Sequence, residues 1–137
     1  MTGRSFWGDP QAEGEVSTEE LSFWMDAGAA AFTDCDAVAA DTKVLSRALT
    51  YARSLGALII MHPQDPGLSG GAAVTSGKFA SLKGLPAVSP MVERIGLERD
   101  LALVEMTRAR YHADQITTAT ALPALSRAKA DGLDVTA

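Results

Sequence analysis

The clearest pattern in the chain is a stripe of apolar residues between positions 41 and 56. Apolar side chains recur there at intervals of three and four residues, namely Val44, Leu45, Ala48, Leu49, Ala52 and Leu55. This spacing places them on one face of an amphipathic helix. Asp41 precedes the stripe as a suitable N-cap, and Gly56 follows it as a suitable stop. The pattern therefore predicts a helix over residues 41–55.

Start and stop signals predict four further helices. Ser17 and Glu20 form a capping box for a helix that ends at Gly28. The pair Ser89-Pro90 combines a capping hydroxyl with a proline suited to the first helical position. The remaining helices are expected at residues 78–83, 91–107 and 119–130. Within the long helix, Gly96 costs about 1 kcal/mol relative to alanine.

Short apolar runs between these helices predict strands. The run at residues 57–61 is apolar without alternation, which is typical of a parallel strand covered on both faces. Further strands are expected at residues 29–33, 110–116 and 133–137. Strands that alternate with helices indicate an α/β fold with parallel strands and right-handed crossovers. Residues 1–15 show no periodicity and are predicted to be a loose lead-in to one domain over residues 16–137.

Composition and charge exclude several classes of protein. The chain has 137 residues, of which 47% are hydrophobic and 21% charged, with a net charge of −5. No dense stripe of Lys and Arg is present, which argues against a nucleic-acid partner. No run of about 18 apolar residues predicts a membrane span, and residues 1–10 lack the pattern of a secretory signal. Cys35 is the only cysteine, so we expect no internal disulfide and a cytoplasmic protein.

Polar residues follow three of the predicted strands. They lie at positions 33–36, 62–65 and 112–118. In barrels and open parallel sheets, functional sites lie beyond the carboxyl ends of the strands. These three segments are therefore the candidate site.

The same segments carry a family resemblance. Residues 27–34 (AGAAAFTD), 48–65 (ending IMHPQD), 77–86, 110–118 and 128–137 (AKADGLDVTA) resemble five dihydroorotase motifs in the same order. The resemblance implies a partial (β/α)₈ TIM barrel of the metal-dependent amidohydrolase type, with about four parallel strands. It also implies a hydrolase that interconverts dihydroorotate and carbamoyl aspartate in pyrimidine biosynthesis, with zinc as its metal.

The resemblance assigns metal-ligand positions to specific residues. The metal-binding histidine at the end of a strand falls on His62. An acidic family position falls on Cys35, with Asp34 and Asp36 on either side of it. A second family histidine falls on Gln115, which is a degenerate ligand position because an amide oxygen binds Zn²⁺ far more weakly than imidazole. A catalytic zinc needs about three protein ligands, so we expect no activity from this chain alone.

Each candidate also has a simpler interpretation. His62 can be a structural hydrogen-bonding residue, and His112 is expected to be a satisfied core histidine. Cys35 can be a small buried residue, and Asp34 and Asp36 can be loop caps.

Two functions remain open. The chain can belong to a dihydroorotase-like enzyme that needs the rest of its barrel. Alternatively, it can belong to a non-catalytic homologue that acts as a structural partner of aspartate carbamoyltransferase. In both cases an incomplete barrel leaves sheet edges unpaired, so we expect self-association.

Overall fold

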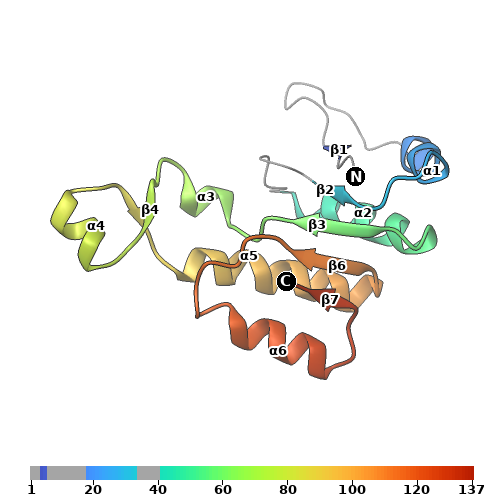
Figure 1. The fold of residues 1–137 in the computed structure, drawn as a ribbon. Helices are drawn as coiled ribbons and strands as arrows, with labels where there is room; N and C mark the ends of the chain where they lie inside the picture. Colours follow the sequence, from blue (N-terminus) through green and yellow to red (C-terminus); the bar gives the residue numbers. More distant parts are fainter. Residues whose placement is uncertain (1–3, 6–17, 34–40) are drawn as a thin grey trace.

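The computed structural model describes residues 4–5, 18–33 and 41–137. Five strands form one parallel sheet in the order β1-β2-β3-β6-β7 (Figure 1). Their bounds are β1 Arg4–Ser5, β2 Phe32–Thr33, β3 Leu58–Met61, β6 Arg110–Ala113 and β7 Val135–Thr136. The expected parallel α/β arrangement is confirmed. The lead-in expected over residues 1–15 contributes the two-residue strand β1.

Four longer helices accompany this sheet. They are α1 Thr18–Asp26, α2 Thr42–Ser54, α5 Met91–Thr107 and α6 Leu122–Ala130. The N-cap prediction for α2 is confirmed, because the Asp41 carboxylate accepts from the N–H groups of Lys43 and Val44. Ser17, the predicted cap of α1, lies outside the described residues. None of the helices that the structure describes is long and apolar enough to cross a membrane.

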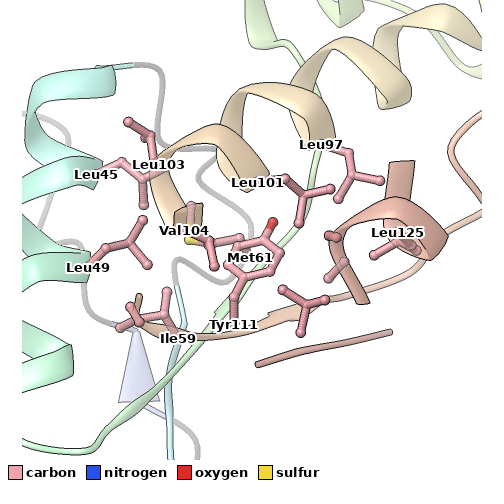
Figure 2. Packing of buried hydrophobic residues seen from close by; sticks show 14 of the residues in the cluster. Leu45, Leu49, Ile59, Met61, Leu97, Leu101, Leu103, Val104, Tyr111 and Leu125 are labelled. Atoms are coloured by element: carbon pink, nitrogen blue, oxygen red, sulfur yellow. The ribbon is translucent and has the colours of Figure 1, made fainter. Parts of the chain in front are cut away.

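The core lies between helices α2, α5 and α6 and one face of the sheet. Leu45 and Leu49 of α2 lie near Leu103 and Val104 of α5, Leu97 and Leu101 of α5 lie toward Leu125 of α6, and Tyr111 of β6 is fully buried in the same cluster (Figure 2). Along β3, the buried residues Ile59 and Met61 alternate with the half-buried residues Leu58 and Ile60. Alternation of this kind means that one face of the strand meets the helices and the other does not.

The face away from the helices carries a row of aligned residues. Thr33 pairs in register with Ile60, Ile60 with His112, and His112 with Thr136. His112 is half-buried, and its Nδ1 lies 2.8 Å from Thr136 Oγ1. The predicted hydrogen bond of His112 is confirmed. The predicted position in the core is wrong, because His112 lies on this second face of the sheet.

A small arm extends from the sheet between β3 and α5 (Figure 1). It contains two short helices and two short parallel strands: α3 Pro66–Ser69, β4 Val74–Thr75, α4 Lys78–Lys83 and β5 Ala87–Val88. The predicted helix over residues 78–83 is confirmed. The two strands were missed, because two-residue strands carry no periodic signal.

Several predicted boundaries are wrong by a few residues. The strand expected at 29–33 is reduced to Phe32–Thr33, since Gly28 and Ala29 donate backbone hydrogen bonds to Met25 and Trp24 and so cap α1. The helix expected from residue 119 begins at Leu122, after a turn. The strand expected to reach residue 116 ends at Ala113. Strand 133–137 is reduced to Val135–Thr136.

The start of α5 also differs slightly from the prediction. Pro90 is the N-cap and not the first helical residue, and the Ser89 hydroxyl accepts from the N–H of Met91 at 3.2 Å. The helix nevertheless begins where this Ser-Pro pair placed it.

Helix α5 and strand β6 are joined by a buried acid. Asp100 is 0% exposed and accepts a hydrogen bond from the Tyr111 hydroxyl at 2.8 Å. Arg99 donates to the same carboxylate from Nε at 2.9 Å and Nη2 at 2.7 Å. Burial raises the pKa of Asp100, and these partners oppose that rise without cancelling it. The acid therefore fixes the position of α5 on β6 at an electrostatic cost.

Gly96 allows α5 to approach the end of β3 closely. A Cβ at this position would lie 2.7–2.9 Å from backbone atoms of Gln64. Real Cβ atoms do not approach backbone atoms so closely, so any side chain here would push the helix away from the segment that follows β3. Packing therefore requires glycine at this position, although glycine is a weak helix former.

We expect Gly96→Ala to destabilise the protein by about 1–3 kcal/mol, the usual cost of overpacking, although alanine is the better helix former. Urea unfolding measures the change. Gly77→Ala is the matched control, since its Cβ would meet nothing within 4 Å and its backbone is extended. Equal stability of Gly96→Ala and the parent would show that the contact with Gln64 relaxes freely.

Candidate functional site

The candidate site lies where β3 and β6 end side by side. Strand β3 ends at Met61 and passes directly into His62. The N–H of Asp114 donates to the Met61 carbonyl at 2.8 Å, which holds the chain after β6 beside the chain after β3. The parallel register of Met61 with Ala113 thus brings the polar segments that begin at His62 and Asp114 to one rim.

His62 occupies the wall of a small cavity at this rim. The cavity has a volume of about 150 Å³ and lies between the rim, the arm and the start of α5. The polar residues that line it are His62, Gln64, Thr75, Ser89, Glu93, Thr117 and Thr118. The Nδ1 atom of His62 is buried and has no hydrogen-bond partner among the described residues. A buried nitrogen without a partner is costly, and it gives this histidine the capacity to bind a further group.

Glu93 is the most highly connected polar residue of the site. It lies in the first turn of α5 and is 8% exposed. Its Oε2 accepts from the N–H of Thr117 at 2.9 Å and from the Thr117 hydroxyl at 2.6 Å. Its Oε1 accepts from the N–H of Thr118 at 2.9 Å and from the Thr118 hydroxyl at 2.7 Å. Both oxygens of this buried carboxylate are therefore fully engaged by one loop.

These contacts determine the protonation of Glu93. Burial alone would raise the pKa of Glu93, and the hydrogen bonds from Thr117 and Thr118 outweigh burial, so the pKa lies below its usual value. A carboxylate with a lowered pKa stabilises the fold above the pH range in which unfolded glutamate titrates. That contribution is lost as the pH falls through the lower folded pKa.

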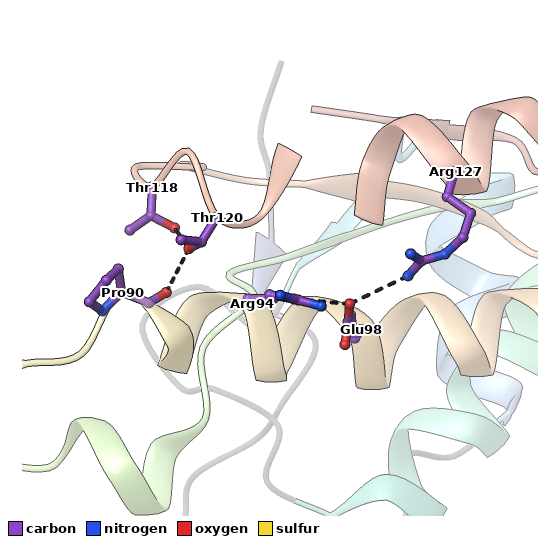
Figure 3. A network of polar contacts seen from close by, with 6 residues as sticks. All are labelled: Pro90, Arg94, Glu98, Thr118, Thr120 and Arg127. Atoms are coloured by element: carbon purple, nitrogen blue, oxygen red, sulfur yellow. Dashed lines mark hydrogen bonds and ion pairs between the residues drawn. The ribbon is translucent and has the colours of Figure 1, made fainter. Parts of the chain in front are cut away.

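A second group of contacts ties the same loop to the start of α5 (Figure 3). The Thr120 hydroxyl donates to the Pro90 carbonyl at 3.1 Å and lies 3.0 Å from the Thr118 hydroxyl. Further along α5, Glu98 accepts from Arg94 at 3.1 Å and from Arg127 of α6 at 3.4 Å (Figure 3). The start of α5 thus fixes the loop after β6, while its middle contacts α6.

The predicted site residues have different outcomes. His62 lies at the rim, as the position after β3 predicts. Gln115 lies on the loop after β6, exposed, with a φ of 55°. Cys35, Asp34 and Asp36 lie outside the described residues. Asp65 caps α3 by accepting from the N–H of Leu68 at 2.9 Å.

The described residues do not complete a metal site. Within them, no group of three or more His, Cys, Asp or Glu side chains could hold a metal ion. His62 offers one free nitrogen, and the oxygens of Glu93, which lines the same cavity, are occupied by four hydrogen bonds. The donor set that the structure describes therefore falls short of the three protein ligands that a catalytic zinc needs.

Sequence reasoning missed Glu93. Its partners lie 24 and 25 residues further along the chain, and no periodic pattern connects them. The available signal was an acid in the first turn of a helix that follows a Ser-Pro start signal, together with two adjacent threonines after a strand. Either feature alone is a common helix or turn signal, so the pairing becomes visible only in the fold.

Comparisons with known proteins show which family the sequence resembles. The sequence model of the family described as "Dihydro-orotase-like" matches residues 12–121. A dihydroorotase from Syntrophobacter fumaroxidans is 38% identical over 88% of this chain and 28% of its own length. A dihydroorotase-like protein from Pseudomonas aeruginosa is 35% identical over 90% of this chain and 29% of its own length. The chain thus spans less than a third of the length of these relatives.

A solved structure shows the same fold. The dihydropyrimidinase from Brevibacillus agri superposes with a TM-score of 0.66 at 22% identity, over 97% of this chain and 29% of that one. The chain therefore has the fold of part of an amidohydrolase (β/α)₈ TIM barrel, and that prediction is confirmed.

Proposed function

The chain belongs to the dihydro-orotase-like family, and we propose that it forms the central part of a cyclic amidohydrolase barrel acting on dihydroorotate or carbamoyl aspartate. The observation that carries this proposal is the placement of His62. His62 lines a cavity at the carboxyl end of β3, the rim where (β/α)₈ barrels build their sites, and its buried Nδ1 has no hydrogen-bond partner among the described residues. We further propose that the protein works in pyrimidine biosynthesis in the cytoplasm.

The metal of this site is zinc in our proposal, held by His62 and one of Cys35, Asp34 or Asp36. The reasoning is the family resemblance of these positions together with the free nitrogen of His62. Gln115 stands where the family has a further histidine, and a neutral amide is a poor zinc ligand. Two ligands hold a metal weakly, so we propose that this chain by itself is not a catalyst.

A non-catalytic role is the second candidate. The substitution of an imidazole by Gln115 favours it, since loss of a ligand is expected where catalysis is no longer selected. Relatives named as dihydroorotases and relatives named as dihydroorotase-like proteins match at similar identity, 38% and 35%, so identity does not separate the two candidates. In the non-catalytic case the partner would be aspartate carbamoyltransferase, and co-purification of the two proteins after joint expression tests this.

We expect no dihydroorotate hydrolysis above the uncatalysed background from the 137-residue chain, with or without added Zn²⁺. The reason is the incomplete donor set. The absorbance of dihydroorotate followed over time measures the reaction, and a complete dihydroorotase is the positive control. Turnover that a chelator abolishes would contradict the proposal that the chain is inactive alone.

We expect the isolated chain to self-associate. Among the described residues, strands β1 and β7 are the two ends of the sheet, and unpaired strand edges attract other strands. Light scattering coupled to gel filtration gives the mass in solution. A monomer of 14.3 kDa at every concentration would show that the edges are covered within one copy.

We expect His62→Ala to remove whatever Zn²⁺ binding the chain has, because the free Nδ1 is lost. His112→Ala is the matched control: it removes another imidazole of the sheet, one whose Nδ1 is already paired with Thr136. Calorimetric titration with Zn²⁺ compares both with the parent. If His62→Ala binds as tightly as the parent, His62 is a structural histidine.

A further inference from the structure

The loop over residues 114–118 has a strained backbone between two fixed ends. Gln115 adopts a φ of 55°, a left-handed conformation that costs a residue with a side chain about 1–2 kcal/mol. Such conformations persist where the surroundings determine them. At one end, the N–H of Asp114 is bound by Met61. At the other end, the N–H groups of Thr117 and Thr118 are bound by Glu93.

We propose that Glu93 is a positioning residue: its carboxylate holds the rim loop in the conformation in which Thr117 and Thr118 line the His62 cavity. The inference rests on the proposed function in one respect, namely that this rim is the functional one. The loop has no helix or strand of its own, so its shape depends on contacts with other elements. Glu93 supplies four of these contacts, with lengths of 2.6–2.9 Å.

A simple helix-capping role does not account for the arrangement. An acid in the first turn of a helix interacts favourably with the helix dipole without any partner in another segment. Here both oxygens instead face the backbone and side chains of a loop 24 residues away. Thr120 adds a further hydrogen bond from the same segment to Pro90, beside the same helix start. The contacts are specific for the loop after β6.

Glu93→Gln tests the proposal, because an amide has one acceptor oxygen where the carboxylate has two. Amide hydrogen exchange at Thr117 and Thr118, followed by NMR in the 137-residue chain, should accelerate by about tenfold or more, the change that corresponds to about 1.4 kcal/mol. The signals of the His62 ring should shift as well. Glu105→Gln is the matched control, since it removes the same charge from an exposed site on the same helix.

A second variant separates loop geometry from charge. Replacing both Thr117 and Thr118 with valine keeps Glu93 charged and removes two of the four hydrogen bonds, so it should loosen the loop to an intermediate degree. Serine at both positions keeps the hydroxyls and should behave as the parent does. This pair of variants also decides the outcome if Glu93→Gln fails to fold.

Rescue at Gln115 distinguishes positioning from general stability. Glycine adopts positive φ without penalty, so adding Gln115→Gly to Glu93→Gln should return the His62 ring signals towards those of the parent. The proposal is overturned if Glu93→Gln matches Glu105→Gln in exchange and ring signals, or if glycine gives no recovery. These readouts need neither metal nor substrate, so chelator-sensitive turnover by the chain, or zinc binding that His62→Ala leaves unchanged, would count against the proposed function alone.

Discussion

Close contact between helix α5 and the chain that follows β3 is the constraint on which the rest of this structure depends. Gly96 makes the contact possible, since a Cβ there would overlap the backbone of Gln64. With the helix at this distance, Leu97, Leu101 and Val104 reach the core, and Asp100 reaches the hydroxyl of Tyr111. The same placement brings Glu93 within hydrogen-bond distance of the loop after β6. One helix therefore sets the spacing of both strand ends that form the rim.

The two buried acids of α5 show how differently a protein can treat a charge that it removes from water. Four hydrogen bonds surround Glu93 and hold its pKa below the usual value. Asp100 lies deeper, and its contacts with Arg99 and Tyr111 leave its pKa raised. The two carboxyl groups therefore affect stability in opposite directions. Falling pH weakens the stabilisation by Glu93, whereas rising pH increases the free-energy cost of burying Asp100. Glu93, whose burial is offset by hydrogen bonds, is the acid that faces the candidate site.

Local patterns were sufficient to predict most of the elements and the family, but not the contacts of the site. The stripe from Val44 to Leu55 and the Ser-Pro pair before α5 are local signals, and both predicted helices are present. The position of His62 followed from its place directly after an apolar run. The positive φ of Gln115 and the early end of β6 at Ala113 could not be predicted from local sequence signals. They lie in or next to the loop that Glu93 binds, and the partners of Glu93 are distant in sequence. Gly96 likewise has its reason in the backbone of Gln64, which lies beside it only in the fold.

The face of the sheet away from helices α2, α5 and α6 connects folding with function. Parallel sheets are normally covered on both faces, yet helices α2, α5 and α6 contact one face, and Ile60 and His112 on the other are half-exposed. In a (β/α)₈ barrel that second face is the packed interior, and the catalytic rim lies at its end. The residues that would close the barrel over Ile60 would therefore also bring the remaining strand ends to His62. The residues that cover this face of the sheet and the residues that complete the site are thus expected to belong to the same part of the barrel.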